Sequence, residues 1–427
     1  MSFNEANKNS NNSPLKSSNF KSLRFLINYL FKWIVIALAI GCLIGSASAL
    51  FLTSLEFVTQ FRENHLWIIS LLPLVGLIIG LLYHHYGKSV EAGNNLIIAN
   101  IQNPKEIISF KMAPMVYFGT LATHLFGGSA GREGTALQMS AAIADQFSKP
   151  FKLSDYDRTI LLTAAVAGGF GSVFGTPIAG AIFALEFSKR DRIQYEAIFP
   201  AAITALFANF ITGLWQVDHT HYFIPEIPTT TFINLTYTII AGIIFGICAR
   251  FFSLGMKYLS SFFKSYIQYP PLRPFVGGLI VVFCIGLLGT TKYIGLGIPT
   301  IVTAFENQLP YYDFAIKFVL TVITLSTGFK GGEVTPLFFI GATLGSALSF
   351  FIPLPTGLLA GMGFVTVFAG ATNTPIACIM MAMELFGLDC GIYVTIACIV
   401  AYYISGNTSI YSQQLVMPST EKSNYIQ

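Results

Sequence analysis

Two charged residues, Arg132 and Glu133, lie inside a glycine-rich turn, residues 127–135, that has apolar sequence on both sides. The segment after this turn, residues 136–147, is helix-like but only about three helical turns long. A helix needs about 20 residues to cross the hydrocarbon core of a bilayer. We therefore expect this helix to begin inside a membrane, with the turn and its charges at depth.

The composition places such a turn in a membrane protein. Of the 427 residues, 54% are hydrophobic and 10% are charged, and the mean hydropathy is +0.65. Soluble domains have about a quarter of their residues charged, so we expect an all-α polytopic protein embedded in a lipid bilayer. The apolar stretches differ in length, which indicates tilted and re-entrant helices, because irregular backbone at membrane depth must be buried in protein.

A helix that begins at membrane depth can bind an anion. Its first turn has free N–H groups and a partial positive charge, and transporters commonly build substrate sites from such broken helices. Glu133 could occupy this anion site when it is charged and leave the site when it is protonated. That exchange would link the movement of an anion to the movement of a proton.

The glutamate turn recurs about 200 residues later in the chain. Residues 131–137 and 331–337 share Gly, Glu, Thr and Leu at matching positions, and Thr-Pro-Ile-Ala at 176–179 recurs at 374–377. Two matches in the same order at nearly the same spacing predict an internal duplication.

Basic residues predict the orientation of the two copies, because loops that carry Lys and Arg are cytoplasmic in membrane proteins. The basic residues beside the first span and after the first-half motifs are Lys16, Lys21, Arg24, Lys32, Lys149, Lys152, Arg158, Lys189, Arg190 and Arg192. The equivalent second-half stretches, 349–358 and 387–392, hold no Lys or Arg. The repeat is therefore predicted to be inverted, with a cytoplasmic N-terminus and a site at the repeat interface near mid-membrane.

A polar break at residues 217–230 separates the two copies. We expect four segments along the chain, which are a disordered cytoplasmic tail (1–22), a first membrane repeat (23–216), a second, inverted membrane repeat (231–415) and a short C-terminal tail (416–427). The functional residues should lie where the two repeats meet.

The turn Gly131-Arg132-Glu133-Gly134, the second glycine-rich helix start at 331–336 and Ser409-Ile410-Tyr411 together resemble the CLC family of anion channels and proton-coupled anion antiporters. The resemblance covers roughly residues 25–415. It implies a CLC-type fold, a multi-pass place in the plasma membrane and a homodimer with one pathway per subunit. It also implies that Glu133 is the external gate and proton carrier and that Tyr411 closes the inner side of the anion site.

Four departures from the usual CLC pattern resemble its fluoride-exporting branch, CLC-F. Asn94 stands where a serine normally touches chloride, and Thr135 replaces the proline that normally follows the glutamate turn. Gly332-Glu333-Val334-Thr335-Pro336 stands where Gly-x-Phe-x-Pro is usual, and Phe187 stands where chloride exchangers have a second proton glutamate. The resemblance therefore implies a fluoride/proton antiporter. A chloride/proton exchanger or chloride channel of the same fold is the alternative.

The chemistry of fluoride agrees with these residues. Fluoride is small and strongly hydrated, so a site that removes its water must supply close donors, of which charge-assisted ones are strong. A charged carboxyl at Glu333 would cost about 2.5–3.5 kcal/mol at depth, whereas a neutral one could donate to fluoride. We expect Glu133 and Glu333 to pass a proton inward while fluoride moves out. The predicted anion-binding residues are Asn94, Gly131, Arg132, Gly134, Val334, Thr335 and Tyr411.

Several of these residues also have structural interpretations. Glu133, Asn94 and Thr335 could serve only as helix caps, and Tyr411 could be an interfacial aromatic. Arg132 is expected to hold loop carbonyls or a carboxylate rather than the substrate. Two further glutamates that follow the second motif of each copy are interpreted as structural, namely Glu186 and Glu384.

A different class of function is suggested by residues 127–131, which fit the G-x-S-x-G pattern of serine hydrolases around Ser129. His124 is close in sequence, but no histidine has a spacing that marks it as the partner base. The six cysteines and six histidines show no metal-ligand spacing. We therefore expect no enzyme activity, no metal, no cofactor and no nucleic-acid partner.

Overall fold

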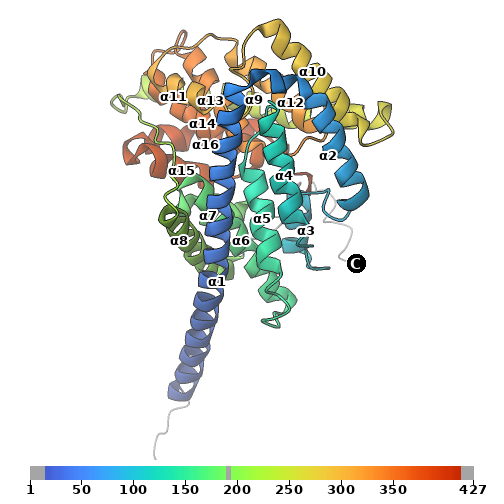
Figure 1. Ribbon diagram of the computed structural model, residues 1–427. Coiled ribbons are helices and arrows are strands. Elements are labelled where there is room, and N and C mark those ends of the chain that lie inside the picture. Colours follow the sequence, from blue (N-terminus) through green and yellow to red (C-terminus); the bar gives the residue numbers. More distant parts are fainter. Residues whose placement is uncertain (1–14, 189–193, 415–427) are drawn as a thin grey trace, which may run out of the picture.

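The computed structural model describes residues 15–188 and 194–414. Over these residues the chain forms sixteen α-helices, four short 3-10 helices and no strand (Figure 1). The helices of the first half are α1 (Leu15–Asn64), α2 (Leu72–Tyr86), α3 (Asn94–Gln102), α4 (Met112–Leu125), α5 (Glu133–Asp145), α6 (Asp155–Phe174), α7 (Pro177–Phe187) and α8 (Ile198–Leu214). The helices of the second half are α9 (Phe232–Tyr266), α10 (Leu272–Leu288), α11 (Ile298–Glu306), α12 (Asp313–Ser326), α13 (Val334–Leu348), α14 (Thr356–Thr372), α15 (Pro375–Phe386) and α16 (Gly391–Ser405). The 3-10 helices are η1 (Leu66–Leu71), η2 (Tyr195–Ala197), η3 (Leu388–Cys390) and η4 (Ser412–Gln414).

Two boundaries differ from those predicted. Helix α1 begins at Leu15, inside the expected tail 1–22, because extending an existing helix is much easier than starting one. Helix α5 begins at Glu133 rather than near residue 136, so the glutamate belongs to the helix itself. The rest of the N-terminal tail (1–14), the basic residues Lys189, Arg190 and Arg192, and the tail 416–427 lie outside the described residues.

The helices fall into two length classes, as the sequence predicts. Five segments are long and apolar enough to cross a membrane, namely Ile27–Asn64, Leu66–Tyr86, Tyr195–Leu214, Phe232–Tyr266 and Leu388–Ser405. Helices α3, α5 and α13 have only 9, 13 and 15 residues, fewer than the roughly 20 that a crossing needs. Each of these three begins at a buried residue, so three helix starts lie inside the protein.

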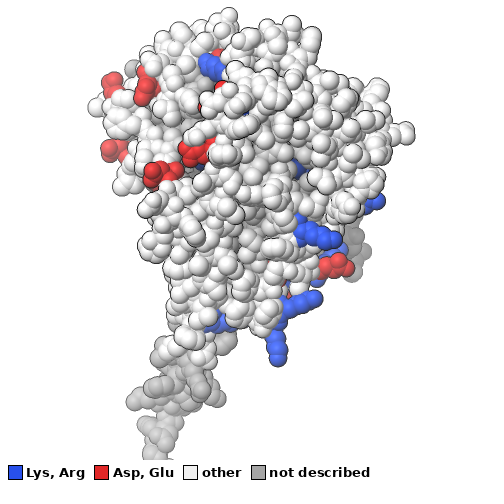
Figure 2. Space-filling model, in the orientation of Figure 1, with Lys and Arg blue, Asp and Glu red and all other residues white. Residues whose placement is uncertain are grey.

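The face of the molecule shown in Figure 2 has a wide band with few charged side chains. In the face shown in Figure 2, acidic side chains gather towards one end of the molecule, and most basic ones lie towards the end from which the first part of α1 projects. Such a band is the surface that a bilayer covers. The excess of basic residues near the α1 end agrees with the charge asymmetry of multi-pass membrane proteins, whose loops on one side of the membrane carry most of the Lys and Arg.

The two glutamate turns are joined directly to each other. The Gly131 N–H donates to the Gly332 carbonyl at 2.6 Å, and the Gly332 N–H donates to the Gly131 carbonyl at 2.7 Å. This pairing is antiparallel, so the two turns run in opposite directions about a local two-fold axis. A Cβ on Gly131 would lie 2.9 Å from the Gly332 oxygen. The predicted inverted repeat is thus confirmed at its centre.

A second exchange between the repeats involves the two glutamates interpreted as structural. The Glu384 carboxylate, near the end of α15, accepts the N–H groups of Ile178 (3.0 Å) and Ala179 (2.7 Å) at the start of α7. Reciprocally, the Glu186 carboxylate near the end of α7 accepts the N–H groups at the start of α15, at 3.2 and 2.8 Å. Each repeat therefore caps a helix of the other with a negative charge at its positive end.

Removing one of these caps should destabilise the protein. We expect Glu384→Ala to lower the melting temperature of the purified protein in detergent, because the first N–H groups of α7 lose their acceptor, at a cost of about 1–2 kcal/mol. Glu306→Ala, which removes an exposed carboxylate at the end of α11, is the control. Equal melting temperatures for the two variants would contradict the capping role.

A buried ion pair holds the far ends of the site helices. Arg158 at the start of α6 donates from Nε and Nη2 to the two carboxylate oxygens of Asp145 at the end of α5, both at 2.7 Å. The same Nη2 donates to Asn100 in α3 at 3.1 Å. Two-pronged Arg–carboxylate bonds fix geometry as well as adding stability. This network therefore fixes α3 and α5, whose other ends carry Asn94 and Glu133.

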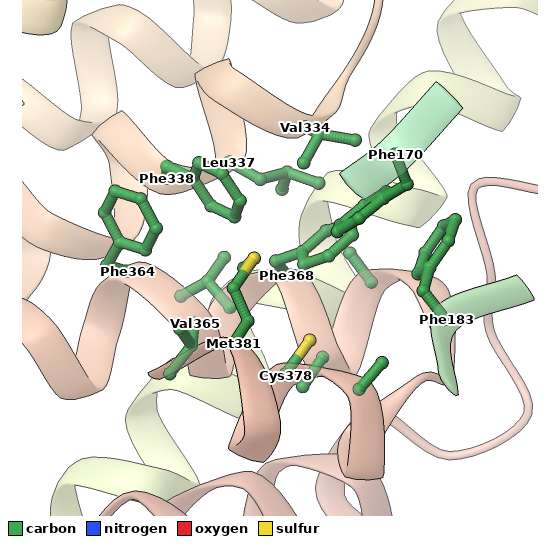
Figure 3. Close-up of a cluster of buried hydrophobic side chains, with 14 of the residues drawn as sticks. Phe170, Phe183, Val334, Leu337, Phe338, Phe364, Val365, Phe368, Cys378 and Met381 are labelled. Carbon is green, nitrogen blue, oxygen red and sulfur yellow. The ribbon is translucent and has the colours of Figure 1, made fainter. Parts of the chain in front are cut away.

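The apolar core lies beside the start of α13 (Figure 3). The Phe338 and Phe364 rings are stacked with centroids 3.9 Å apart, and the Phe170 and Phe183 rings are 4.2 Å apart. Val334, the first residue of α13, is fully buried in this core. The packing joins α13 and α14 of the second repeat to α6 and α7 of the first, and so fixes the position of the second glutamate turn.

Candidate anion and proton site

Glu133 is the first residue of α5, but its carboxylate is bonded at the start of α13, the corresponding helix of the second repeat. Its carboxylate is fully buried, and one oxygen accepts the Thr335 hydroxyl. The other oxygen accepts the backbone N–H groups of Thr335 and Arg132, both at 3.1 Å. Thr335 lies in the first turn of α13, whose N–H groups and dipole favour an anion. The carboxylate of Glu133 therefore sits in a position that a free anion could take.

Arg132 lies beside this carboxylate. Its Nε is 3.7 Å from Glu133 Oε1, and the side chain is 17% exposed. Over the described residues Arg132 Nε is buried without a hydrogen-bond acceptor. The guanidinium thus stabilises the negative charge at Glu133, in agreement with its predicted role as the partner of a carboxylate.

Glu333 ends on the opposite side of the paired turns, near Asn94. A Cβ placed on Gly134 would lie 3.0 Å from Asn94 Nδ2 and 3.6 Å from Glu333 Oε2. Among the described residues, Glu333 Oε2 and Asn94 Oδ1 are both buried without a hydrogen-bond partner. Buried polar atoms are costly when they are left unpaired. The starts of α3, α5 and α13 therefore converge on a small polar space whose groups are free to bind a ligand.

Two cavities border the site. The larger has a volume of about 930 Å³, and Asn94, Glu333 and Tyr411 are in its wall. The smaller has a volume of about 20 Å³ and is lined by Glu133 and Thr335 among others. The two glutamates therefore line different cavities, and each cavity is also lined by a residue of the adjoining turn, Gly331 in the larger and Arg132 in the smaller.

Tyr411 lies where the C-terminal segment returns to the site. It is 1% exposed, and its hydroxyl is buried without a partner among the described residues. Its ring is 5.0 Å from that of Phe187 in a T-shaped arrangement. Phe187 is fully buried, so the Tyr411 ring packs against an aromatic side chain at the end of α7.

Not every predicted site residue offers a group to an anion. Gly131 uses both its N–H and its carbonyl in the pair with Gly332, so its N–H is already occupied. Val334 buries its side chain in the core (Figure 3), which leaves only its backbone N–H at the helix start. Gly134 contributes space, because a side chain there would press on the Asn94 amide.

Some residues at the two cavities are missing from the predicted set. Gln138 and Lys330 line the larger cavity, and His219 and Tyr222, from the polar break between the repeats, line the smaller one. Lys330 was recognisable from sequence, because an ionisable residue inside a membrane segment marks a functional site by default. The others had no such signal, since an uncharged Gln in a helix and polar residues in a connecting loop, such as His219 and Tyr222, are ordinary.

The hydrolase motif does not form a catalytic pair. The Ser129 hydroxyl donates to the Tyr293 carbonyl at 3.0 Å and lies 2.9 Å from the Thr321 hydroxyl. His124 Nε2 lies 3.3 Å from the Gly131 carbonyl. A nucleophilic serine needs its base within hydrogen-bond reach, and in this arrangement each of the two side chains is bonded elsewhere.

Comparisons with known proteins agree with this geometry. The model of a family described as voltage gated chloride channel matches residues 75–406. A chloride/fluoride channel protein of Pseudomonas syringae pv. tomato is 50% identical over 397 residues, which cover 92% of this chain and 88% of that protein. The H(+)/Cl(-) exchange transporter ClcA of Vibrio parahaemolyticus is 25% identical and covers 90% of this chain and 89% of its own.

Solved structures give the same result for the fold. The crystal structure of a CLC-type fluoride/proton antiporter superposes with a TM-score of 0.88 and 35% identity, over 91% of this chain and 98% of that one. A slow cyanobacterial Cl-/H+ antiporter superposes with a TM-score of 0.78 at 20% identity, over 90% and 97%. The second likeness concerns the fold alone.

Proposed function

Because this chain belongs to the voltage gated chloride channel family, we propose that it exports fluoride from the cytoplasm in exchange for protons. The observation that carries the proposal is that the Glu133 carboxylate accepts hydrogen bonds from the N–H and the hydroxyl of Thr335, at the start of α13. An anion and this carboxylate cannot use the same donors at once. Binding of one therefore requires the other to leave.

The donors around the two carboxyl groups favour fluoride over chloride. Fluoride needs several short hydrogen bonds to replace its water, and the site has the Thr335 hydroxyl and N–H, the Asn94 amide and a buried carboxyl at Glu333. Chloride is larger and accepts weaker bonds, so it gains less from such a tight set of donors. The 35% identical fluoride/proton antiporter structure supports the same assignment.

Protonation of Glu133 supplies the coupling. A charged carboxylate is held by three donors and by Arg132. A protonated carboxyl loses most of this attraction, because charge-assisted hydrogen bonds are roughly twice as strong as neutral ones. It therefore yields its place to fluoride and carries its proton towards the opposite cavity, where Glu333 receives it.

The wider setting follows from the same proposal. The N-terminus is cytoplasmic, and the membrane is the plasma membrane. The larger cavity is lined by the ends of α2 and α9 and opens to the cytoplasm. The protein works as a homodimer with a complete pathway in each subunit. It acts as a transporter, since its two buried carboxyl groups line two cavities, and we expect no hydrolase activity because the Ser129 hydroxyl is bonded to the Tyr293 carbonyl and lies beside the Thr321 hydroxyl.

Anion efflux from liposomes tests the proposal. The purified protein is reconstituted in parallel into liposomes loaded with fluoride or with chloride, while external pH is followed. We expect fluoride efflux with a matching rise in external pH and little chloride movement. Chloride movement as fast as that of fluoride would overturn the fluoride assignment, and fluoride efflux without proton uptake would identify a channel.

Glu333→Gln tests the second carboxyl. The amide can still donate to fluoride but cannot carry a proton, so we expect proton uptake per fluoride to fall by about a hundredfold or more, the lower end of the contribution of a positioned proton-transfer group. Glu91→Gln, at an exposed carboxylate of the same cavity, is the matched control. An unchanged proton-to-fluoride ratio in Glu333→Gln would remove this residue from the proton path.

A further inference from the structure

A lysine faces the larger cavity without an acidic partner. Lys330 lies three residues before Glu333, in the connection between α12 and α13, and lines the same cavity. Over the residues that the structure describes, no carboxylate lies within ion-pair distance of its ammonium group. Glu91 of the same cavity interacts with this ammonium group only from beyond ion-pair distance. Ionisable groups inside a membrane protein are costly, so a lysine without an ion-paired carboxylate requires a functional account.

Two helices hold Lys330 in place. Its Nζ lies 3.7 Å from the centre of the Tyr83 ring at the end of α2, which is a close cation–π contact. On the other side, a Cβ on Gly119 of α4 would lie 3.0 Å from the Cβ and Cγ of Lys330. Glycine at 119 thus leaves room for the lysine stem. The ring face stabilises the ammonium group without neutralising it, so its charge remains available to an anion.

The cavity as a whole favours anions. Its basic residues are Lys88, Lys264, Arg273 and Lys330, its acidic residues are Glu91 and Glu333, and His84 is also in its wall. A cleft with an excess of one charge concentrates ions of the opposite charge. Lys88 and Lys264 are exposed, and Arg273 donates from Nε to the Ile267 carbonyl at 2.9 Å. Lys330 is the basic residue that the chain places next to the Glu333 turn.

We propose that Lys330 and Tyr83 form a second fluoride-binding site in this cavity, from which the anion passes to Asn94 and Glu333. The proposal rests on the fluoride transport inferred above. An ammonium group is a compact charge with three donors, so it binds fluoride that still keeps part of its water. The dehydration of the ion is then divided between two sites. The site at Asn94 and Glu333 receives an ion that has already lost some of its water.

Fluoride kinetics in liposomes test this second site. The half-saturating fluoride concentration and the maximal rate are measured for the unmodified protein and for Lys330→Gln, Lys330→Arg and Lys264→Gln. We expect Lys330→Gln to raise the half-saturating concentration by about three- to tenfold, as for the loss of one charge near a partly buried ligand. The maximal rate and the proton-to-fluoride ratio should change little, and Lys330→Arg should stay near the unmodified protein. Lys264→Gln removes the same charge from an exposed position and should have a small effect.

The tyrosine provides an independent test. Tyr83→Phe keeps the ring and should behave like the unmodified protein, whereas Tyr83→Leu should raise the half-saturating concentration in the same direction as Lys330→Gln. If Lys330→Gln and Lys264→Gln raised the half-saturating fluoride concentration equally, Lys330 would only add to the general positive charge of the cavity, and the proposed site would be overturned. The site would also be overturned if Lys330→Gln lowered the maximal rate and left the half-saturating fluoride concentration unchanged. Absence of fluoride transport in the unmodified protein would instead overturn the function on which the proposal rests.

Discussion

Glu133→Gln should abolish coupled exchange. The carboxylate of Glu133 accepts two hydrogen bonds from Thr335 at the start of α13 and one from the Arg132 N–H. In glutamine, the NH2 group would face one of these donors in place of an acceptor. It is also permanently neutral, so it can neither compete with fluoride as an anion nor carry a proton. We expect proton uptake driven by fluoride to fall by roughly a hundredfold or more, measured as the pH rise outside fluoride-loaded liposomes.

The same exchange of Glu for Gln at an exposed residue provides the control for this result. Glu306→Gln at the end of α11 changes charge without touching either cavity and should transport normally. The melting temperature of Glu133→Gln in detergent shows whether the variant is folded. A folded Glu133→Gln that takes up protons at the normal ratio would show that Glu133 is only a helix cap.

Gly341→Ala should strongly destabilise the protein. Helices α13 and α14 cross where Gly341 meets Gly363, and a Cβ on Gly341 would lie 2.0 Å from the Gly363 oxygen. One turn further, a Cβ on Gly345 would lie 2.1 Å from the Leu359 oxygen. Small residues let membrane helices approach this closely, so the larger residue must push the backbones apart. We expect a loss of about 3 kcal/mol, the upper end of the overpacking scale, seen as a lower melting temperature.

Gly286→Ala gives the matched comparison. Gly286 lies in α10, and no atom lies within 4 Å of the Cβ that alanine would add. Alanine favours a helix over glycine by about 1 kcal/mol, so Gly286→Ala should be neutral or slightly stabilising. Helix α13 also carries Thr335, which binds the Glu133 carboxylate. Any Gly341→Ala protein that folds should therefore exchange fluoride poorly, because a shift of α13 displaces Thr335. A Gly341→Ala protein with normal melting and normal transport would show that the two helices adjust without cost.

The predictions from sequence were strongest where local patterns carry the information. Apolar composition predicted the membrane class. The matched glutamate turns predicted the duplication, the distribution of Lys and Arg predicted that the repeat is inverted, and the Gly131–Gly332 pair joins its two copies. The interpretation of Glu186 and Glu384 as structural agrees with their reciprocal capping bonds. The extent of α1 was underestimated, because residues 15–22 have the polar composition of a tail and only the adjoining helix makes them helical.

The partners of each site residue could not be predicted in the same way. The sequence suggested that Glu133 lies at the anion site of its own turn, whereas its carboxylate binds the start of α13, about 200 residues away. It also predicted Gly131 as an anion-binding residue, whereas the Gly131 N–H is used in the pair with Gly332. The contact between Lys330 and Tyr83 had no signal in the sequence, since it joins a loop of one repeat to a helix of the other.

The sequence by itself determined the membrane class, the duplication, the short helices that begin at depth and the two glutamates of the site. Each of these depends on composition or on residues close together in the chain. Only the tertiary structure decided which cavity each carboxyl group faces and which donors Glu133 takes. The physical reason is that three short helices from distant segments meet at their starts, where the absence of a side chain at Gly134 lets Asn94 and the Gly332 backbone approach α5 closely.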